Sequence, residues 1–172
     1  IKVDITRAGE SRSVLFSGDV GRWDKPILRD PSTFEEADYV LIESTYGNRL
    51  HEPPEAIDGR LEDIVNRTEQ AGGNIVIPSF AIERTQELLY HLNHLLIERR
   101  IPEIAIFVDS PMAIKVNEVF QKHAELFDEE MMELVNRSLS PFDLPNLNLS
   151  RTTRESKAIN RIRGTIIVIA GS

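Results

Sequence analysis

From residue 53 to its end, the chain alternates short apolar runs with longer segments whose apolar side chains recur every three or four residues. Ile57, Leu61 and Val65, for example, are spaced so that they share one face of a helix. Strands that are apolar throughout and separated by amphipathic helices are typical of a parallel sheet covered on both faces. We therefore predict an α/β unit with strands at 74–77, 104–108 and 165–170, helices at about 55–71, 82–100, 112–124, 128–136 and 155–162, and a loop at 138–150.

The first 50 residues have a different pattern. Residues 1–6 alternate apolar and polar side chains, a turn follows at 8–10, and the alternation returns at 13–17, which predicts a hairpin with one solvated face. Residues 39–42 predict a short buried strand. We therefore predict two parts, an antiparallel β piece at 1–50 and the α/β unit at 51–172.

The composition narrows the class of protein. Its 172 residues, 41% of them hydrophobic and 28% charged, are enough for one domain or for one and a half. No apolar run is long enough for a membrane span, and the lack of cysteine excludes disulfides and thiolate metal sites and is compatible with the cytoplasm, where we expect the protein to reside. Because apolar strands run to both ends, we expect the chain to be an excerpt of a longer protein.

The net charge of −8 argues against a surface that neutralises phosphates in general. It leaves room for a nuclease, because a cleft can be locally basic on an acidic protein. The basic residues are scattered, with small clusters at 99–100 and 151–163, and such clusters are more often solvated helix faces than binding sites.

Two apolar runs stop at an acidic residue beside glycine or small hydroxyl residues. The first, 15–22, contains Asp19, and the second, 41–49, contains Glu43. Two strands that end in this way can bring both carboxylates to one edge of a sheet, as in a hydrolytic metal centre, where Asp19 would be a metal ligand. The alternatives are that Asp19 only forms a turn and that Glu43 only accepts hydrogen bonds from the backbone of residues 44–46.

Two predicted strands of the α/β unit are followed by a serine and then by a helix. Ser79 and Ser110 could offer hydroxyl donors to a phosphate at this edge, where helix N-termini also favour anions, and Arg84 could pair with the same phosphate. The alternatives are that the two serines only cap their helices and that Arg84 lies on the surface or pairs with a glutamate.

The four histidines have no metal-site spacing. His91 and His94 share a predicted helix with leucines, so we expect them to pack at the surface or in half-buried positions. His51 alone lies close to the proposed site in sequence. No phosphate-binding loop, dinucleotide fingerprint, nucleophile elbow or zinc finger is present.

Three motifs resemble one known family. The segments FSGDVGR at 16–22, IESTYGNR at 42–49 and IPSFAIERTQEL at 77–88 are similar to the β-CASP branch of the metallo-β-lactamase superfamily, with DSPMA at 109–113 and IAGS at 169–172 in agreement. The resemblance covers essentially the whole chain. It implies that residues 1–50 are part of the metallo-β-lactamase fold, and that 51–172 are an incomplete β-CASP insertion that closes over the active site, with the substrate in the cleft between the two parts.

The resemblance also implies an activity, that of a zinc-dependent ribonuclease with two metal ions, acting on single-stranded RNA. Asp19 matches the aspartate that bridges both metals, and Glu43 matches the acidic residue of the first β-CASP motif, which supports a histidine near the scissile phosphate. The family's histidine clusters would lie before residue 1 and after residue 172, so we expect this excerpt alone neither to hold zinc tightly nor to cleave RNA.

Two other readings stay open. Some relatives process DNA ends, and a catalytically inactive relative could serve as a scaffold or RNA-binding subunit. A homo-oligomer is also compatible with the sequence.

Overall fold

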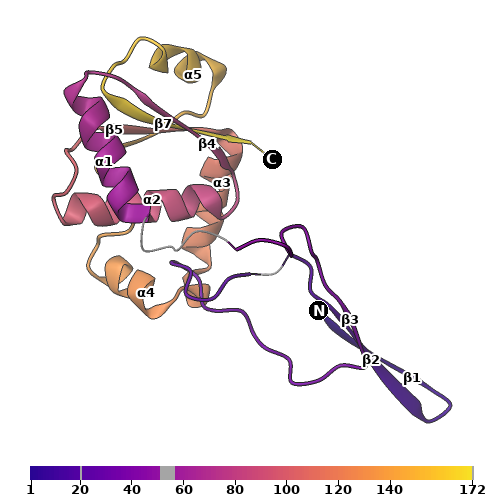
Figure 1. Cartoon of the computed structure of the whole chain (residues 1–172). Helices are drawn as coiled ribbons and strands as arrows, with labels where there is room; N and C mark the ends of the chain where they lie inside the picture. Colours follow the sequence, from indigo (N-terminus) through magenta and orange to yellow (C-terminus); the bar gives the residue numbers. More distant parts are fainter. Residues whose placement is uncertain (20, 51–56, 172) are drawn as a thin grey trace. The chain divides into compact units, whose positions relative to one another are not determined.

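The structure, a computed structural model, describes residues 1–19, 21–50 and 57–171. The chain divides into two compact units, Ile1–Lys25 with Arg29–Glu52 and Pro26–Leu28 with Pro53–Ser172. Each unit has its own sheet (Figure 1). That these units are the two domains implied by the resemblance stays a prediction. Within the described residues, no helix is both long and apolar enough to cross a bilayer.

The larger unit contains a parallel sheet of four strands in the order β4-β7-β5-β6. Three of its strands were predicted from their apolar runs, and the fourth, β6, lies in the segment predicted as a loop. The parallel arrangement confirms the predicted fold class. The strands are β4 (Ile75–Phe80), β5 (Ala105–Asp109), β6 (Leu147–Leu149) and β7 (Thr165–Gly171).

Five α-helices and a short 3₁₀ helix connect or flank these strands in the described part of the unit, close to where the apolar spacing predicts the helices. Their bounds are α1 (Ile57–Gln70), α2 (Arg84–Ile97), α3 (Pro111–Lys122), η2 (Ala124–Leu126), α4 (Glu129–Asn136) and α5 (Thr153–Ile159).

The core lies on the face of the sheet that packs against α2 and α3. Ile106 and Val108 of β5 and Ile166 of β7 point to this face, because alternate residues of a strand share a side. Leu89 and Leu92 of α2 belong to the same buried cluster. Fully burying each of these side chains contributes about 1.5–3 kcal/mol to the stability of the unit.

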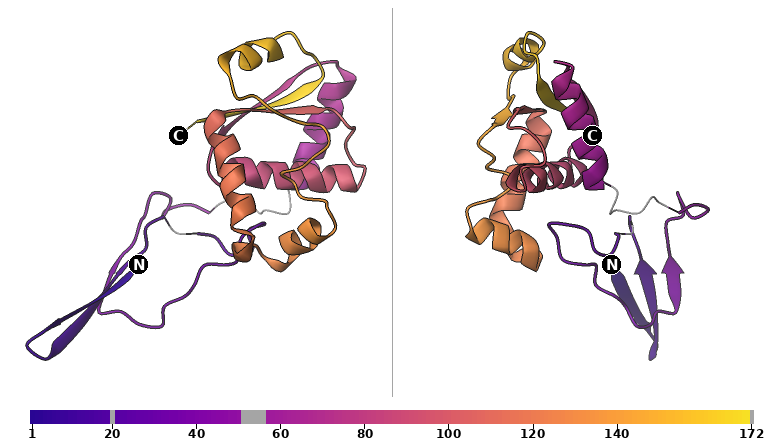
Figure 2. Two further views of the ribbon diagram at one scale, coloured as in Figure 1. Left: turned by 180° about the vertical axis from the view of Figure 1, so that it is seen from behind. Right: turned by 60° about the vertical axis from the view of Figure 1, so that its left-hand side comes forward.

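The opposite face of the sheet is covered less completely. Helix α5 lies on this side, away from α2 (Figure 1, Figure 2). Away from α5, large apolar side chains stay open to solvent: Val76 is 54% exposed, Phe80 67% and Ile169 48%. The prediction that helices cover both faces therefore holds fully for one face and only in part for the other.

The smaller unit has a sheet of three strands. β1 (Lys2–Arg7) and β2 (Glu10–Phe16) form the predicted antiparallel hairpin, whereas β3 (Tyr39–Leu41) pairs with β2 in parallel. The prediction that β3 is buried is wrong, because Tyr39, Val40 and Leu41 are each more than half exposed. The reason is that β3 lies at a sheet edge, and none of the helices assigned in the described residues belongs to this unit to cover its faces.

Candidate functional site

The two acidic motifs leave the small sheet at the same edge. Because β2 and β3 run in parallel with Phe16 opposite Leu41, their carboxyl ends lie side by side. Ser17 joins these ends: its backbone N–H donates to the Leu41 carbonyl at 2.9 Å, and its Oγ accepts from the backbone N–H of Glu43 at 3.2 Å. The structure thus brings together the segments that carry both predicted carboxylates.

The carboxylates themselves are accessible. Asp19, two residues beyond Ser17, is exposed, and it follows Gly18, whose positive φ of 60° turns the chain at the end of β2. Glu43 is also exposed, and its Oε2 accepts from the Thr45 hydroxyl at 3.4 Å, a long and therefore weak hydrogen bond. Two exposed carboxylates at one sheet edge suit the chemistry of cation binding, and their catalytic roles stay predictions.

The two serines of the large unit lie at the carboxyl edge of its sheet. In the sheet, Ser79 of β4 is opposite Ala170 of β7, and Asp109 of β5 is opposite Ile169. Ser110, which follows Asp109, is therefore separated from Ser79 by β7, about 10 Å at two strand spacings. Both predicted phosphate contacts thus share one edge, where ligands of parallel sheets usually bind.

The serines differ in their local roles. Ser110 is buried and caps α3, because its Oγ accepts from the backbone N–H of Ala113 at 3.2 Å. Ser79 does not cap a helix: α2 starts only after Glu83, and the Ser79 hydroxyl donates to the Phe80 carbonyl at 3.3 Å. The capping alternative therefore describes Ser110 and not Ser79.

Arg84 pairs with a glutamate, as the alternative interpretation of the sequence predicts. Its Nη1 lies 2.9 Å from Oε2 of Glu87, one turn along α2, while the Arg84 side chain stays 56% exposed. An incoming phosphate would have to compete with the Glu87 carboxylate for this guanidinium. The predicted role of Arg84 in phosphate binding stays a prediction.

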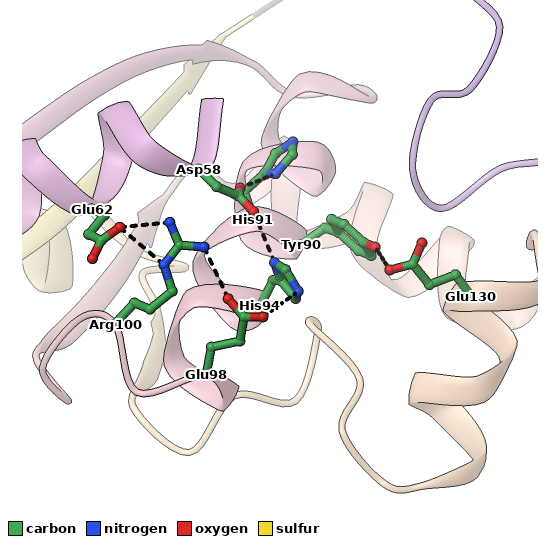
Figure 3. A network of polar contacts seen from close by, with 8 residues as sticks. All are labelled: Asp58, Glu62, Tyr90, His91, His94, Glu98, Arg100 and Glu130. Carbon is green, nitrogen blue, oxygen red and sulfur yellow. Dashed lines mark hydrogen bonds and ion pairs between the residues drawn. The ribbon is translucent and has the colours of Figure 1, made fainter. Parts of the chain in front are cut away.

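The histidines of α2 bind a carboxylate rather than forming a metal site. Nδ1 of His91 and Nδ1 of His94 lie 2.7 and 2.9 Å from the two oxygens of Asp58, in the first turn of α1 (Figure 3). Glu98 lies 3.4 Å from Nε2 of His94. No three His, Asp or Glu side chains within the described ranges are arranged to hold a metal ion. His51, the histidine nearest to the motifs in sequence, lies outside the described residues.

Asp58 is the partner that sequence reasoning missed. It lies 33 and 36 residues from the two histidines, so no local spacing indicates the contact. Burial alone would raise the pKa of Asp58, but hydrogen bonds from His94 and His91 more than offset it and hold the pKa below its ordinary value of 3.8. The pair of contacts joins α1 to α2, and Arg100 extends the network by binding Glu62 and Glu98 (Figure 3).

Comparison with known proteins identifies similar chains. The Beta-Casp domain family matches residues 85–172. The chain is 38% identical over 169 residues to "Ribonuclease TTHA0252" of Thermus thermophilus, an alignment that covers 98% of this chain and 38% of that protein.

Two eukaryotic proteins are also similar. The chain is 28% identical over 149 residues to "Endoribonuclease YSH1" of Kluyveromyces lactis, which covers 83% of this chain and 19% of that protein. It is 31% identical over 120 residues to "Cleavage and polyadenylation specificity factor 73" of Drosophila melanogaster, an alignment that covers 69% of this chain and 18% of that protein. The chain thus spans well under half the length of these relatives.

Proposed function

We propose, from the premise that this chain belongs to the Beta-Casp family, that the full-length protein is a ribonuclease that hydrolyses phosphodiester bonds in single-stranded RNA. The observation that carries the proposal is the junction made by Ser17, which holds the segments of Asp19 and Glu43 at one edge of the small sheet. Relatives named as ribonucleases and endoribonucleases support the reaction class.

Asp19 is the residue that we propose as a zinc ligand. An exposed carboxylate at a strand end fits the oxygen ligands that zinc accepts, but the described residues contain no complete ligand set. We propose that the remaining ligands come from other parts of the full-length protein and that the present chain alone is inactive. When bound, two zinc ions would supply an activated water and stabilise charge on the phosphate.

The chain's own residues would position the substrate. Glu43, tied through its backbone to Ser17, would accept a hydrogen bond from a histidine near the scissile phosphate and keep that ring in one orientation. Ser110 caps α3 with its oxygen as acceptor, which leaves its O–H able to donate to a phosphate oxygen. Ser79 and Arg84 would contact neighbouring phosphates from the same edge.

A substrate assay with the full-length protein tests this proposal. Labelled single-stranded RNA and DNA of the same sequence are incubated with the protein, with and without a zinc chelator. We expect cleavage of the RNA that the chelator stops and added zinc restores. Cleavage of DNA alone would favour a DNA-processing nuclease, and binding of RNA without cleavage would favour an inactive scaffold; either result would overturn the proposal.

A further inference from the structure

A pocket of about 260 Å³ lies between α5 and the strands β5 and β6. Phe107, Leu149 and Ile159 give it apolar walls, while Asn148 and Ser150 contribute polar groups. Its volume is below the range of pockets that hold drug-sized ligands, so it suits one ring rather than a whole nucleotide. The pocket is far in sequence from the two acidic motifs and plays no part in the proposed chemistry.

Ser150 is an unusual polar group in this pocket. It is only 4% exposed, and its Oγ has no hydrogen-bond partner in the described structure. Its backbone N–H donates to the Val108 carbonyl at 3.0 Å, which fixes the position of the residue at the end of β6. Buried hydroxyls are normally paired, so an unpaired one that lines a pocket indicates a ligand with a complementary polar atom.

Glu155 also lines the pocket and indicates what kind of group would enter. Its Oε2 accepts from the backbone N–H groups of Arg151 and Thr152 at 2.7 and 2.9 Å, and these bonds lower its pKa, so the group is a carboxylate at neutral pH. A carboxylate repels phosphate but accepts hydrogen bonds from N–H groups. A ring that carries N–H donors and no negative charge, as the edge of a nucleobase does, would therefore fit beside this carboxylate.

The segment around α5 is basic in an acidic chain. Residues 151–163 contain five Lys and Arg residues and one Glu, a net charge of +4, whereas the whole chain carries −8. Arg151 lies 3.3 Å from Glu118. The other four side chains are exposed and form no ion pair with any described residue; they are Arg154, Lys157, Arg161 and Arg163.

These positive charges lie beside the pocket. Arg154 and Lys157 are the chain neighbours of Glu155 and Ala158, which line it. Their spacing of three residues places them on one side of α5. A polyanion that runs along this side of the helix would therefore have its phosphates near cations and one of its uncharged groups near the pocket.

We propose that the pocket and the segment 151–163 form a docking site for single-stranded RNA, with one unstacked base in the pocket and flanking phosphates on Arg154 and Lys157. The inference rests on the proposed function, which supplies RNA as the substrate. Single-stranded RNA is recognised in this way, by bases inserted beside aromatic side chains and by cations along the backbone.

RNA binding by the full-length protein, measured by fluorescence anisotropy, tests the docking site. We expect the double variant Arg154→Glu, Lys157→Glu to raise the Kd by about tenfold or more, and to reduce the slope of log K against log salt by roughly 1.4, the value for two lost phosphate contacts on a single strand. The matched control Arg99→Glu, Lys122→Glu makes the same charge change at exposed positions elsewhere, and we expect it to have a much smaller effect.

The variant Ala158→Phe tests the pocket separately from the charges. Filling the pocket should weaken binding of RNA but leave binding of inorganic polyphosphate, which has no bases, unchanged. Circular dichroism checks the fold of Ala158→Phe. If this variant misfolds, the double variant Arg154→Glu, Lys157→Glu alone decides whether RNA docks at this site. A Kd that is unchanged in the double variant, or that shifts equally in the control, would overturn the docking site.

Cleavage is measured in parallel to separate this inference from the proposed function. A wild-type protein that cleaves RNA, while its α5 variants bind RNA as tightly as wild type, would overturn the docking site and leave the ribonuclease intact. A protein that binds RNA as predicted but never cleaves it would overturn the ribonuclease and leave the docking site.

Discussion

At the scale of single residues, one well-connected polar contact of the larger unit lies outside the acidic motifs. Asp58 accepts hydrogen bonds from two histidines on another helix, and it is the charged partner that keeps their rings in place (Figure 3). Asp58 therefore contributes to holding α1 against α2.

Replacing Asp58 by Asn should reduce the free energy of unfolding by about 1–3 kcal/mol at pH 7, because hydrogen bonds to a charged group are lost in a partly exposed site. Urea denaturation measures the change. Asp63→Asn is the control, since Asp63 forms an exposed pair with Arg67 that should contribute less than about 1 kcal/mol.

The Asp58 contribution should depend on pH with a definite sign. Because its folded pKa lies below the ordinary value of 3.8, the stability is present above that pH and is lost as the pH falls through the lowered pKa. The difference between wild type and Asp58→Asn should therefore shrink below about pH 4. A difference of the same size at pH 3 and pH 7 would show that the carboxylate charge is not responsible.

At the scale of elements, long periodic segments were predictable and short ones were not. Helices α1 to α5 and strands β4, β5 and β7 lie close to their predicted positions, because their apolar side chains repeat over several positions. Strand β6 was missed since its three residues lie among asparagines and prolines that are typical of loops, and its pairing with β5 is a tertiary contact. The burial of β3 was wrong for a related reason: an apolar run shows what a strand could bury, not what covers it.

The same limit applies to Ser79 and Ser110, which look equivalent in sequence. Only Ser110 caps a helix, so Ser110→Ala should reduce the free energy of unfolding by about 1 kcal/mol through loss of the cap on α3. Ser79→Ala removes no cap and should reduce the free energy of unfolding by a smaller amount. Thermal unfolding of both variants measures the difference, and an equal loss in the two would contradict these assigned roles.

The hairpin of the small unit contains a correctable strain. Ala8 and Gly9 form its two-residue turn with φ of 52° and 88°. The left-handed conformation is unfavourable in free energy for alanine, because its Cβ atom comes too close to the following carbonyl oxygen. Ala8→Asn should slow amide hydrogen exchange in β1 and β2, since asparagine tolerates the same φ. Exchange that is unchanged or faster in the variant would show that the turn does not limit opening of the hairpin.

At the scale of the whole molecule, the family and its motifs were recognisable in the sequence, whereas the arrangement of the site was only partly so. Parallel pairing of β2 and β3 brings the ends of the two motifs together, as the pattern of strands ending in carboxylates predicted. The Ser17 bridge that fixes this junction was not predictable, because it joins residues 26 apart through one hydroxyl. The chain spans 38% of the Thermus thermophilus relative, so the proposed metal centre has to be tested in the full-length protein.

The most direct test of the account is the rate at which full-length Asp19→Ala cleaves single-stranded RNA in the presence of zinc. If Asp19 is a metal ligand as proposed, its removal should lower the cleavage rate by more than the roughly 10–100-fold typical of residues that only support ligands. Asp4→Ala, which removes an exposed carboxylate from β1, should keep the wild-type rate. We expect loss of cleavage with unchanged circular dichroism in Asp19→Ala, and near-normal turnover by that correctly folded variant would show that Asp19 does not serve the reaction.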